Sequence, residues 1–141
     1  MKILVINGPN INMLGIREPN IYGEKTYNEL LEYISKSAEE LGIDVTFFQS
    51  NSEGKIIDAV QGAYKKMDGI IINPAGYTHT SIAIPDAIKA VGIPAVEVHI
   101  TDISTREEFR KISYTSDACI KTIYGKGFLG YAQAMKILKE I

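Results

Sequence analysis

Short apolar runs along this chain alternate with longer segments in which apolar residues recur at helical spacing. The runs are rich in Ile and Val, as expected for parallel strands covered on both faces of a sheet. The spacing i, i+3, i+4 in the longer segments predicts amphipathic helices. The expected strands are 3–6, 43–48, 69–72, 94–98 and 118–123. The expected helices are 27–41, one from Asn51 or Ser52 to about Met67, 81–91, a short one capped by Thr105, and 127–141.

This alternation of strands and helices predicts the fold class. Five βα units with right-handed crossovers form a parallel sheet with helices on both faces. We therefore expect an α/β protein with a flavodoxin-like, doubly wound, five-stranded parallel sheet. The length of 141 residues favours a single catalytic domain over residues 1–141.

Composition narrows the classes of function. A net charge of −2 gives no electrostatic reason to expect binding to nucleic acid or to an anionic membrane. One cysteine excludes an internal disulfide framework, and with only two histidines beside it a closed structural zinc site is not expected. No apolar run approaches the ~20 residues that span a bilayer, and the start is too short for a signal peptide. We expect a cytoplasmic protein.

The segment Gly69–Ser81 is the most informative stretch of the sequence. A buried strand ends at Asn73, and a tight turn then leads to His79 at the expected start of a helix. Ligands of open α/β sheets bind at the carboxyl ends of the strands, so Asn73 and His79 are candidate ligand contacts. Taken alone, such residues more often stabilise a turn or cap a helix.

Polar residues after the fourth and first strands favour the functional interpretation. Glu97 and His99 lie two residues apart on the fourth strand, so their side chains share a face. A carboxylate there holds the tautomer of the imidazole and favours its protonated form. Both histidines of the chain thus fall in the same crevice.

The long loop after the first strand supplies the other candidates, Asn10, Arg17 and Tyr22. A tyrosine hydroxyl has a pKa of about 10 and is a poor base at neutral pH, but a nearby guanidinium favours the phenolate and attracts an anionic substrate. The pattern suggests a Tyr or His base, a His acid, and amide and Arg groups for a small anionic, hydroxylated substrate. It indicates proton abstraction beside a carbonyl, or elimination.

Other functions of this fold lack their required residues. A receiver domain needs an acidic pair after the first strand and an Asp after the third, where this chain has Asn7, Gly8 and Asn73. The first loop is too long and bulky for a flavin phosphate loop. Neither GxxxxGK[ST] nor GxGxxG occurs, and there is no nucleophile elbow of a Ser or Cys hydrolase.

Four motifs in this order closely resemble the type II 3-dehydroquinate dehydratases: INGPNINMLGIREPNIYG, QSNSEG, INPAGYTHTSIAIPDA and VEVHITDISTREEFR. The resemblance covers essentially the whole chain. It implies a lyase of the shikimate or quinate pathway that removes water from 3-dehydroquinate to give 3-dehydroshikimate through an enolate, without metal, flavin or Schiff base. A catalytically dead relative that binds a small polyhydroxy acid as a sensor or scaffold is the alternative.

The resemblance also implies roles for individual residues. Tyr22 matches the base and Arg17 the essential loop arginine, while Asn10 matches the amide that holds the water stabilising the enolate. His99 matches the general acid, with Glu97 as its partner. The matched substrate contacts are Asn73, His79, Asp86, Ile100, Thr101 and Arg110.

Two further features follow from the resemblance. The family assembles as a dodecamer of four trimers, in which the aspartate reaches a neighbour's site, so Asp86 is expected to act in trans. The chain has Thr101-Asp102 where members often have Ser-Asn. Thr101 keeps the hydroxyl and the N–H that would hold a substrate carboxylate, and we expect Asp102 to point away from it.

Overall fold

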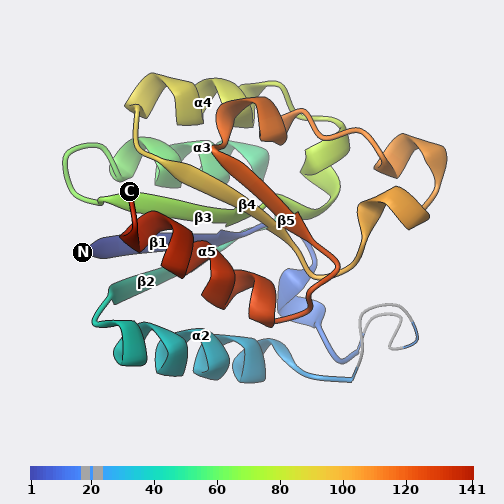
Figure 1. The fold of residues 1–141 in the computed structure, drawn as a ribbon. Coiled ribbons are helices and arrows are strands. Elements are labelled where there is room, and N and C mark those ends of the chain that lie inside the picture. The colour runs from blue at the N-terminus through green and yellow to red at the C-terminus, as the bar shows by residue number, and fades with distance from the viewer. Residues whose placement is uncertain (17–19, 21–23) are drawn as a thin grey trace.

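The computed structural model describes residues 1–16, 20 and 24–141, and its core is one parallel sheet (Figure 1). The strands are β1 (Lys2–Asn7), β2 (Asp44–Gln49), β3 (Gly69–Asn73), β4 (Ala95–His99) and β5 (Lys121–Tyr124). All four pairings are parallel, and the strand order is β2-β1-β3-β4-β5. This is the flavodoxin-like order, so the predicted fold class is confirmed.

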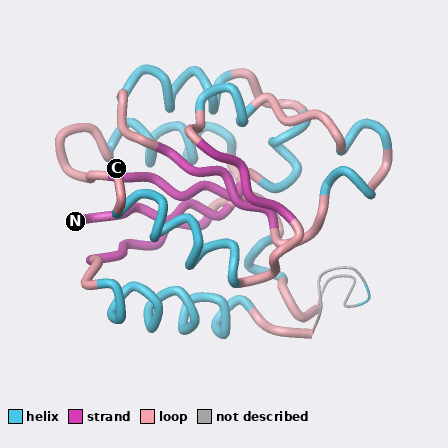
Figure 2. Tube along the Cα trace, viewed as in Figure 1, coloured by secondary structure: helices cyan, strands magenta, loops and turns pink. Residues whose placement is uncertain are grey.

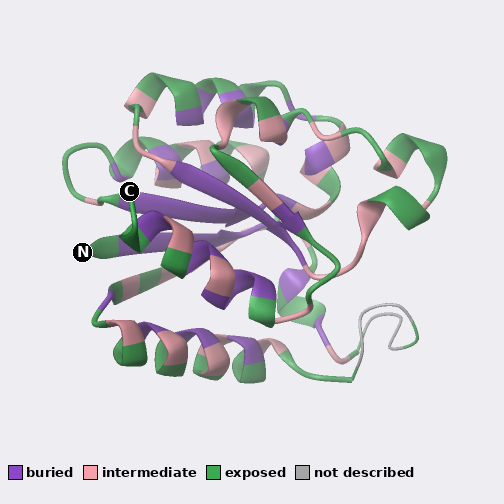
Figure 3. Ribbon diagram, in the orientation of Figure 1, coloured by how far each residue is buried: buried purple, intermediate pink, exposed green. Residues whose placement is uncertain are grey.

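In the described part of the chain, four longer helices cover the two faces of the sheet (Figures 1 and 2). Helices α2 (Tyr27–Leu41) and α5 (Leu129–Lys139) pack on one face, and α3 (Glu53–Gly62) and α4 (Ala83–Val91) on the other. Alternate residues of each strand therefore enter different cores. The central strands β1, β3 and β4 are buried on both sides, whereas the edge strands β2 and β5 are partly exposed and each helix buries only one side (Figure 3).

Local chemistry explains where the helices begin and end. Thr26 Oγ1 accepts a hydrogen bond from Glu29 N–H at the start of α2, and Gly42 adopts a left-handed conformation with φ of 69° after its last residue. Ser52 caps α3, as one of the two expected candidates. Pro85 lies in the first turn of α4, where its missing N–H costs no intrahelical bond.

Two expectations about the segment after β4 are wrong. The chain forms 3-10 turns at Ile103–Thr105 and Glu108–Arg110 instead of one short helix, and Asp102, not Thr105, caps the first of them. The fifth strand begins at Lys121 instead of residue 118, because Thr115–Ala118 form a 3-10 turn. The apolar side chains of Ala118 and Cys119 pack beside the α3/α4 core from this turn, which explains the false strand pattern.

Other boundaries also shift. Helix α3 ends at Gly62 rather than near Met67, since Lys65 turns the chain with φ of 59°. The residues after Asn73 form a 3-10 helix, Ala75–His79, before α4 begins. Among the described residues, no helix has both the length and the apolar character needed to cross a membrane.

Candidate active site

A pocket lies at the carboxyl ends of β1, β3 and β4, where the sequence places its polar strand ends. The order of strands reverses between β1 and β3, and this is the edge at which open α/β sheets bind ligands. Among the described residues, the pocket is lined by Pro9, Asn10, Ile11, Asn73, Ala75, Gly76, His79, His99, Ile100, Thr101, Ile103, Arg106 and Arg110.

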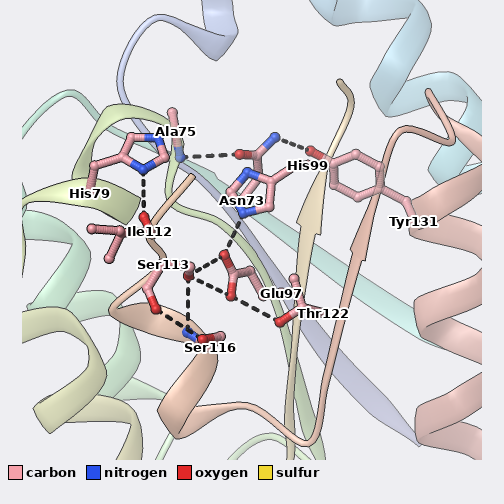
Figure 4. Close-up of polar contacts among 10 residues, drawn as sticks. All are labelled: Asn73, Ala75, His79, Glu97, His99, Ile112, Ser113, Ser116, Thr122 and Tyr131. Atoms are coloured by element: carbon pink, nitrogen blue, oxygen red, sulfur yellow. Dashed lines mark hydrogen bonds and ion pairs between the residues drawn. The ribbon is translucent and has the colours of Figure 1, made fainter. Parts of the chain in front are cut away.

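The end of β4 holds a histidine against a buried carboxylate (Figure 4). His99 Nε2 contacts Glu97 Oε2 in a short hydrogen bond, and Glu97 has no exposed surface. The same carboxylate accepts hydrogen bonds from Ser113 Oγ at 2.7 Å and from Thr122 Oγ1 at 3.2 Å. Thr122 is the partner of Glu97 in the β4–β5 register, so the sheet itself places this hydroxyl.

This arrangement fixes the orientation of the His99 ring. With Nε2 committed to Glu97, Nδ1 is the ring nitrogen left for a ligand in the pocket that His99 lines. A carboxylate removed from water needs a compensating positive charge or several hydrogen bonds. Glu97 has both when His99 carries a proton, so the pair suits a proton donor at the pocket wall.

His79 is held in a different way. Its Nδ1 lies 2.7 Å from the carbonyl oxygen of Ile112, and a carbonyl only accepts, so Nδ1 carries the hydrogen. Burial lowers the pKa of His79, and the hydrogen bond to Ile112 opposes that effect. The positive charges of His99 and Arg110 lower it further, while Glu97 raises it. The neutral ring therefore presents Nε2 as a hydrogen-bond acceptor.

Asn73, the last residue of β3, both stabilises a turn and lines the pocket. Its Oδ1 accepts a hydrogen bond from Ala75 N–H at 3.1 Å, which holds Ala75 in a left-handed conformation with φ of 51°. Its Nδ2 donates to the hydroxyl of Tyr131 at 3.1 Å. The side chain thus stabilises the turn while it lines the pocket.

Asn10 reaches the pocket because β1 and β3 approach closely at Gly8. Gly8 N–H donates to the Asn73 carbonyl at 2.8 Å, and a Cβ at Gly8 would lie 2.7 Å from the carbonyl oxygen of Pro74. Only glycine fits this approach. Asn10 follows with φ of 70°, a left-handed conformation that asparagine tolerates, and its N–H donates to Asn51 Oδ1 at 3.0 Å.

The segment after β4 adds positive charge. Arg106 and Arg110 both line the pocket, and Arg110 Nε forms an ion pair with Glu107 Oε2 at 2.8 Å. Asp102, by contrast, turns its carboxylate to the N–H of Ser104 at 2.9 Å, where it caps the 3-10 turn. Two guanidinium groups beside a pocket with amide and imidazole groups favour a small anionic ligand.

The structure brings together seven of the eleven candidate residues in the pocket lining: Asn10, Asn73, His79, His99, Ile100, Thr101 and Arg110. Glu97 lies behind His99 and supports it. Asp86 is exposed on α4 and outside this pocket. Arg17 and Tyr22 lie outside the described residues.

Several residues with evident roles escaped the sequence analysis. Ser113 and Thr122 hold the Glu97 carboxylate, and Tyr131 joins Asn73 to Asn7. These contacts join residues 16 to 124 positions apart, so no local pattern marks them. Arg106 could have been proposed from the sequence, because it precedes the candidate Arg110 by four residues in the same motif.

Comparison with known proteins identifies the family. Residues 1–139 match the family model described as dehydroquinase class II. The chain belongs to this family. A relative, the 3-dehydroquinate dehydratase of Clostridium acetobutylicum, is 58% identical over 141 residues, which cover 100% of this chain and 98% of the relative. The enzyme of the same name from Caldicellulosiruptor saccharolyticus is 60% identical, with 99% of this chain and 97% of the relative covered.

Solved structures agree with this membership of the dehydroquinase family. The crystal structure of the type II dehydroquinase from Butyrivibrio crossotus superposes with a TM-score of 0.97 at 51% identity, covering 99% of this chain and 97% of that chain. The resemblance found in the four sequence motifs is therefore confirmed.

Proposed function

We propose that the pocket at the ends of β1, β3 and β4 eliminates water from 3-dehydroquinate to give 3-dehydroshikimate. Membership of the class II dehydroquinase family makes the protein a hydro-lyase of the shikimate pathway. The observation that carries the proposal for this pocket is the His99–Glu97 pair, which faces the amide and guanidinium groups of the pocket wall.

The first step removes a proton from the carbon next to the ketone. Tyr22 as phenolate is the base, and Arg17 stabilises the phenolate. These two roles rest on the motif resemblance. The electron pair of the broken C–H bond moves to the ketone oxygen and forms an enolate. A water molecule held by Asn10, which lines the pocket, stabilises this oxygen.

The second step expels the hydroxyl group. The enolate collapses to a ketone conjugated with a new C=C bond, the C–O bond breaks, and the oxygen leaves with a proton from His99 as water. His99 suits this role because Glu97 balances the charge of the imidazolium and directs Nδ1 to the pocket. Base, enolate site and acid are side chains and one water, so the mechanism requires no metal, flavin or imine.

The remaining pocket groups bind substrate. The turn at Ile100 and Thr101 and the guanidinium of Arg110 hold the carboxylate, and Asn73 and His79 bind hydroxyl groups. The carbonyls of Ile100 and Thr101 accept hydrogen bonds from Gly127 and Gly125 N–H at 3.1 Å each, which fixes this turn against the start of α5. The capping role of Asp102 keeps its negative charge off the carboxylate site, which supports this assignment.

The proposed role of Asp86 depends on assembly of the protein into an oligomer. It is exposed on α4 and does not line the pocket of its own chain, which is consistent with a contact to substrate in a neighbouring subunit. We propose a dodecamer of four trimers. Sedimentation of the wild-type protein tests the assembly. Mixing Asp86→Ala subunits with subunits inactivated at His99 tests the contribution in trans, because mixed trimers would contain intact sites.

Three expectations about the whole chain remain proposals: one catalytic domain over residues 1–141, a cytoplasmic location, and substrate as the partner with no nucleic acid or membrane bound. The inactive relative that acts as a sensor or scaffold is not favoured, because full-length relatives are named as dehydratases.

The direct test is turnover in the presence of EDTA. Purified protein is mixed with 3-dehydroquinate, and the ultraviolet absorption of the conjugated product is followed. Continuous growth of this absorption supports the proposal, and no growth contradicts it. Borohydride added during turnover should neither inactivate the protein nor fix substrate mass on a lysine. An adduct seen by intact-mass measurement would replace the enolate mechanism with an imine one.

A further inference from the structure

A single buried hydroxyl lies between two asparagines at the ends of the central strands. Asn7 ends β1 and Asn73 ends β3, and the two residues are partners in the parallel register. Tyr131 on α5 enters from the helix layer, and its side chain has no exposed surface. Its hydroxyl donates to Asn7 Oδ1 at 2.6 Å and accepts from Asn73 Nδ2 at 3.1 Å (Figure 4 shows the Asn73 contact).

The donors and acceptors of this network have one consistent arrangement. The hydroxyl of Tyr131 has one hydrogen, which goes to Asn7 Oδ1, so Asn73 offers its NH₂ group to the hydroxyl oxygen. At the other end of the same amide, the N–H of Ala75 requires an oxygen. Both ends of the Asn73 amide are therefore fixed, one by the turn and one by Tyr131.

Tyr131 is not itself a proton donor or acceptor in the reaction. Burial raises the pKa of its hydroxyl, and the hydrogen bond from Asn73 opposes this shift only in part. A raised phenol pKa keeps the hydroxyl protonated at neutral pH. Tyr131 does not line the pocket, whereas Asn73 does. Of the two hydrogen-bond partners of the hydroxyl, Asn73 lines the pocket and Asn7 does not, so the direct route from the hydroxyl to the substrate runs through Asn73.

We infer that Tyr131 is a positioning residue that fixes the orientation in which Asn73 presents its amide to the substrate. Without the hydroxyl, Asn73 Nδ2 loses its buried partner, and the amide is held at its oxygen end alone. The inference rests on the proposed role of Asn73 as a substrate contact. The ring of Tyr131 packs in the α2/α5 core, so phenylalanine retains the packing and removes only the oxygen.

A double-mutant cycle separates positioning from general stabilisation. Tyr131→Phe, Asn73→Ala and the double variant are compared with wild type in kcat and KM for 3-dehydroquinate, well below their unfolding temperatures. Tyr131→Phe is expected to lower kcat/KM about five- to tenfold, mainly through KM, as for the loss of one buried hydrogen bond. The double variant is expected to equal Asn73→Ala. Tyr33→Phe, which removes a hydroxyl from the same helix layer, should match wild type.

Each other result overturns the inference in a recognisable way. If Tyr131→Phe lies within twofold of wild type, the hydroxyl does not position the site. If the double variant loses the product of the two single losses, Tyr131 acts independently of Asn73 and its role is structural. If Asn73→Ala keeps full kcat/KM, Asn73 is not a substrate contact and Tyr131 has nothing to act through. Only an inactive wild type would also contradict the proposed function.

Discussion

The two histidines of the pocket are held by opposite kinds of partner. His99 places one ring nitrogen on the fully buried carboxylate of Glu97. His79 donates from Nδ1 to the neutral carbonyl of Ile112 at 2.7 Å. Both rings line the same pocket, and in both rings one nitrogen is committed to the protein.

The difference in partner favours different roles for the two rings. Burial lowers the pKa of His79, the hydrogen bond to the Ile112 carbonyl opposes this shift, and the nearby positive groups lower the pKa further. The carboxylate of Glu97, in contrast, can balance a positive charge on the ring that it contacts. The geometry therefore supports the proposed roles, with His99 as the proton donor and His79 as a neutral acceptor for a substrate hydroxyl. The two imidazole rings thus differ in their surroundings, because one ring contacts a carboxylate and the other contacts a backbone carbonyl.

Removal of the His99 ring should have the largest effect. His99→Ala is expected to reduce kcat about 10²- to 10⁴-fold, the range of a positioned general acid, while the fold persists. Product absorbance measures kcat, and circular dichroism checks the fold. A loss of less than tenfold would show that another group protonates the leaving hydroxyl.

Neutralising the partner of His99 should have the next largest effect. Glu97→Gln keeps the shape of the side chain, and with its amide oxygen at the position of Oε1 it can still accept hydrogen bonds from Ser113 and Thr122, but it removes the negative charge next to His99. A charge-assisted hydrogen bond contributes about 1.5–3 kcal/mol, so kcat should fall roughly ten- to a hundredfold. Wild-type turnover in Glu97→Gln would mean that the carboxylate only fills space, and the comparison between the two histidines would lose its basis.

His79→Ala makes the same deletion at the other ring and serves as the matched control. Loss of this neutral hydrogen-bond acceptor should raise KM by about tenfold or less, the effect of losing one hydrogen bond. The change in kcat should be smaller. Steady-state kinetics over a range of substrate concentrations separates the two. If kcat falls as far as in His99→Ala, then His79 takes part in proton transfer.

The smallest expected effect is on the pH dependence of stability. The unfolded chain binds a proton at His79 near pH 6.5, whereas the folded protein binds it only at lower pH, because its pKa is lowered. The contribution of neutral His79 to the free energy of unfolding is therefore full above about pH 6.5. It decreases as the pH falls toward the folded-state pKa.

Urea unfolding of wild type and His79→Gln between pH 7.5 and 5 measures this effect. The stability of wild type relative to the variant should decrease as the pH falls. A difference that is constant, or that grows in favour of wild type, would show that the folded protein does not disfavour the imidazolium.

The sequence predicted the fold well because its patterns are local. The Ile- and Val-rich strands and the i, i+3, i+4 helices each bury a face that their own residues define, and α2 was predicted with both ends correct. The false strand start at residue 118 has the same origin, since Ala118 and Cys119 bury apolar side chains from a turn and not from a strand.

Without the family resemblance, the sequence predicted site residues only at strand ends and in the loop after the first strand, and Arg110 was predicted from the resemblance alone. Glu97 and His99 share a face by their spacing alone. The hydroxyl of Thr122 reaches Glu97 only in the β4–β5 register, and that of Tyr131 reaches Asn73 from a helix 58 residues away. Such contacts depend on how complete elements pack, which no short motif encodes.

The assignment of His99 as acid and Tyr22 as base is the central claim, and isotope exchange tests it most directly. His99→Ala and Tyr22→Phe are each incubated with 3-dehydroquinate in deuterated solvent, and the proton beside the ketone is followed by NMR. We predict slow exchange without product in His99→Ala, because proton abstraction survives while departure of the hydroxyl fails. Tyr22→Phe should show no exchange. Full exchange in Tyr22→Phe together with none in His99→Ala would reverse the two roles.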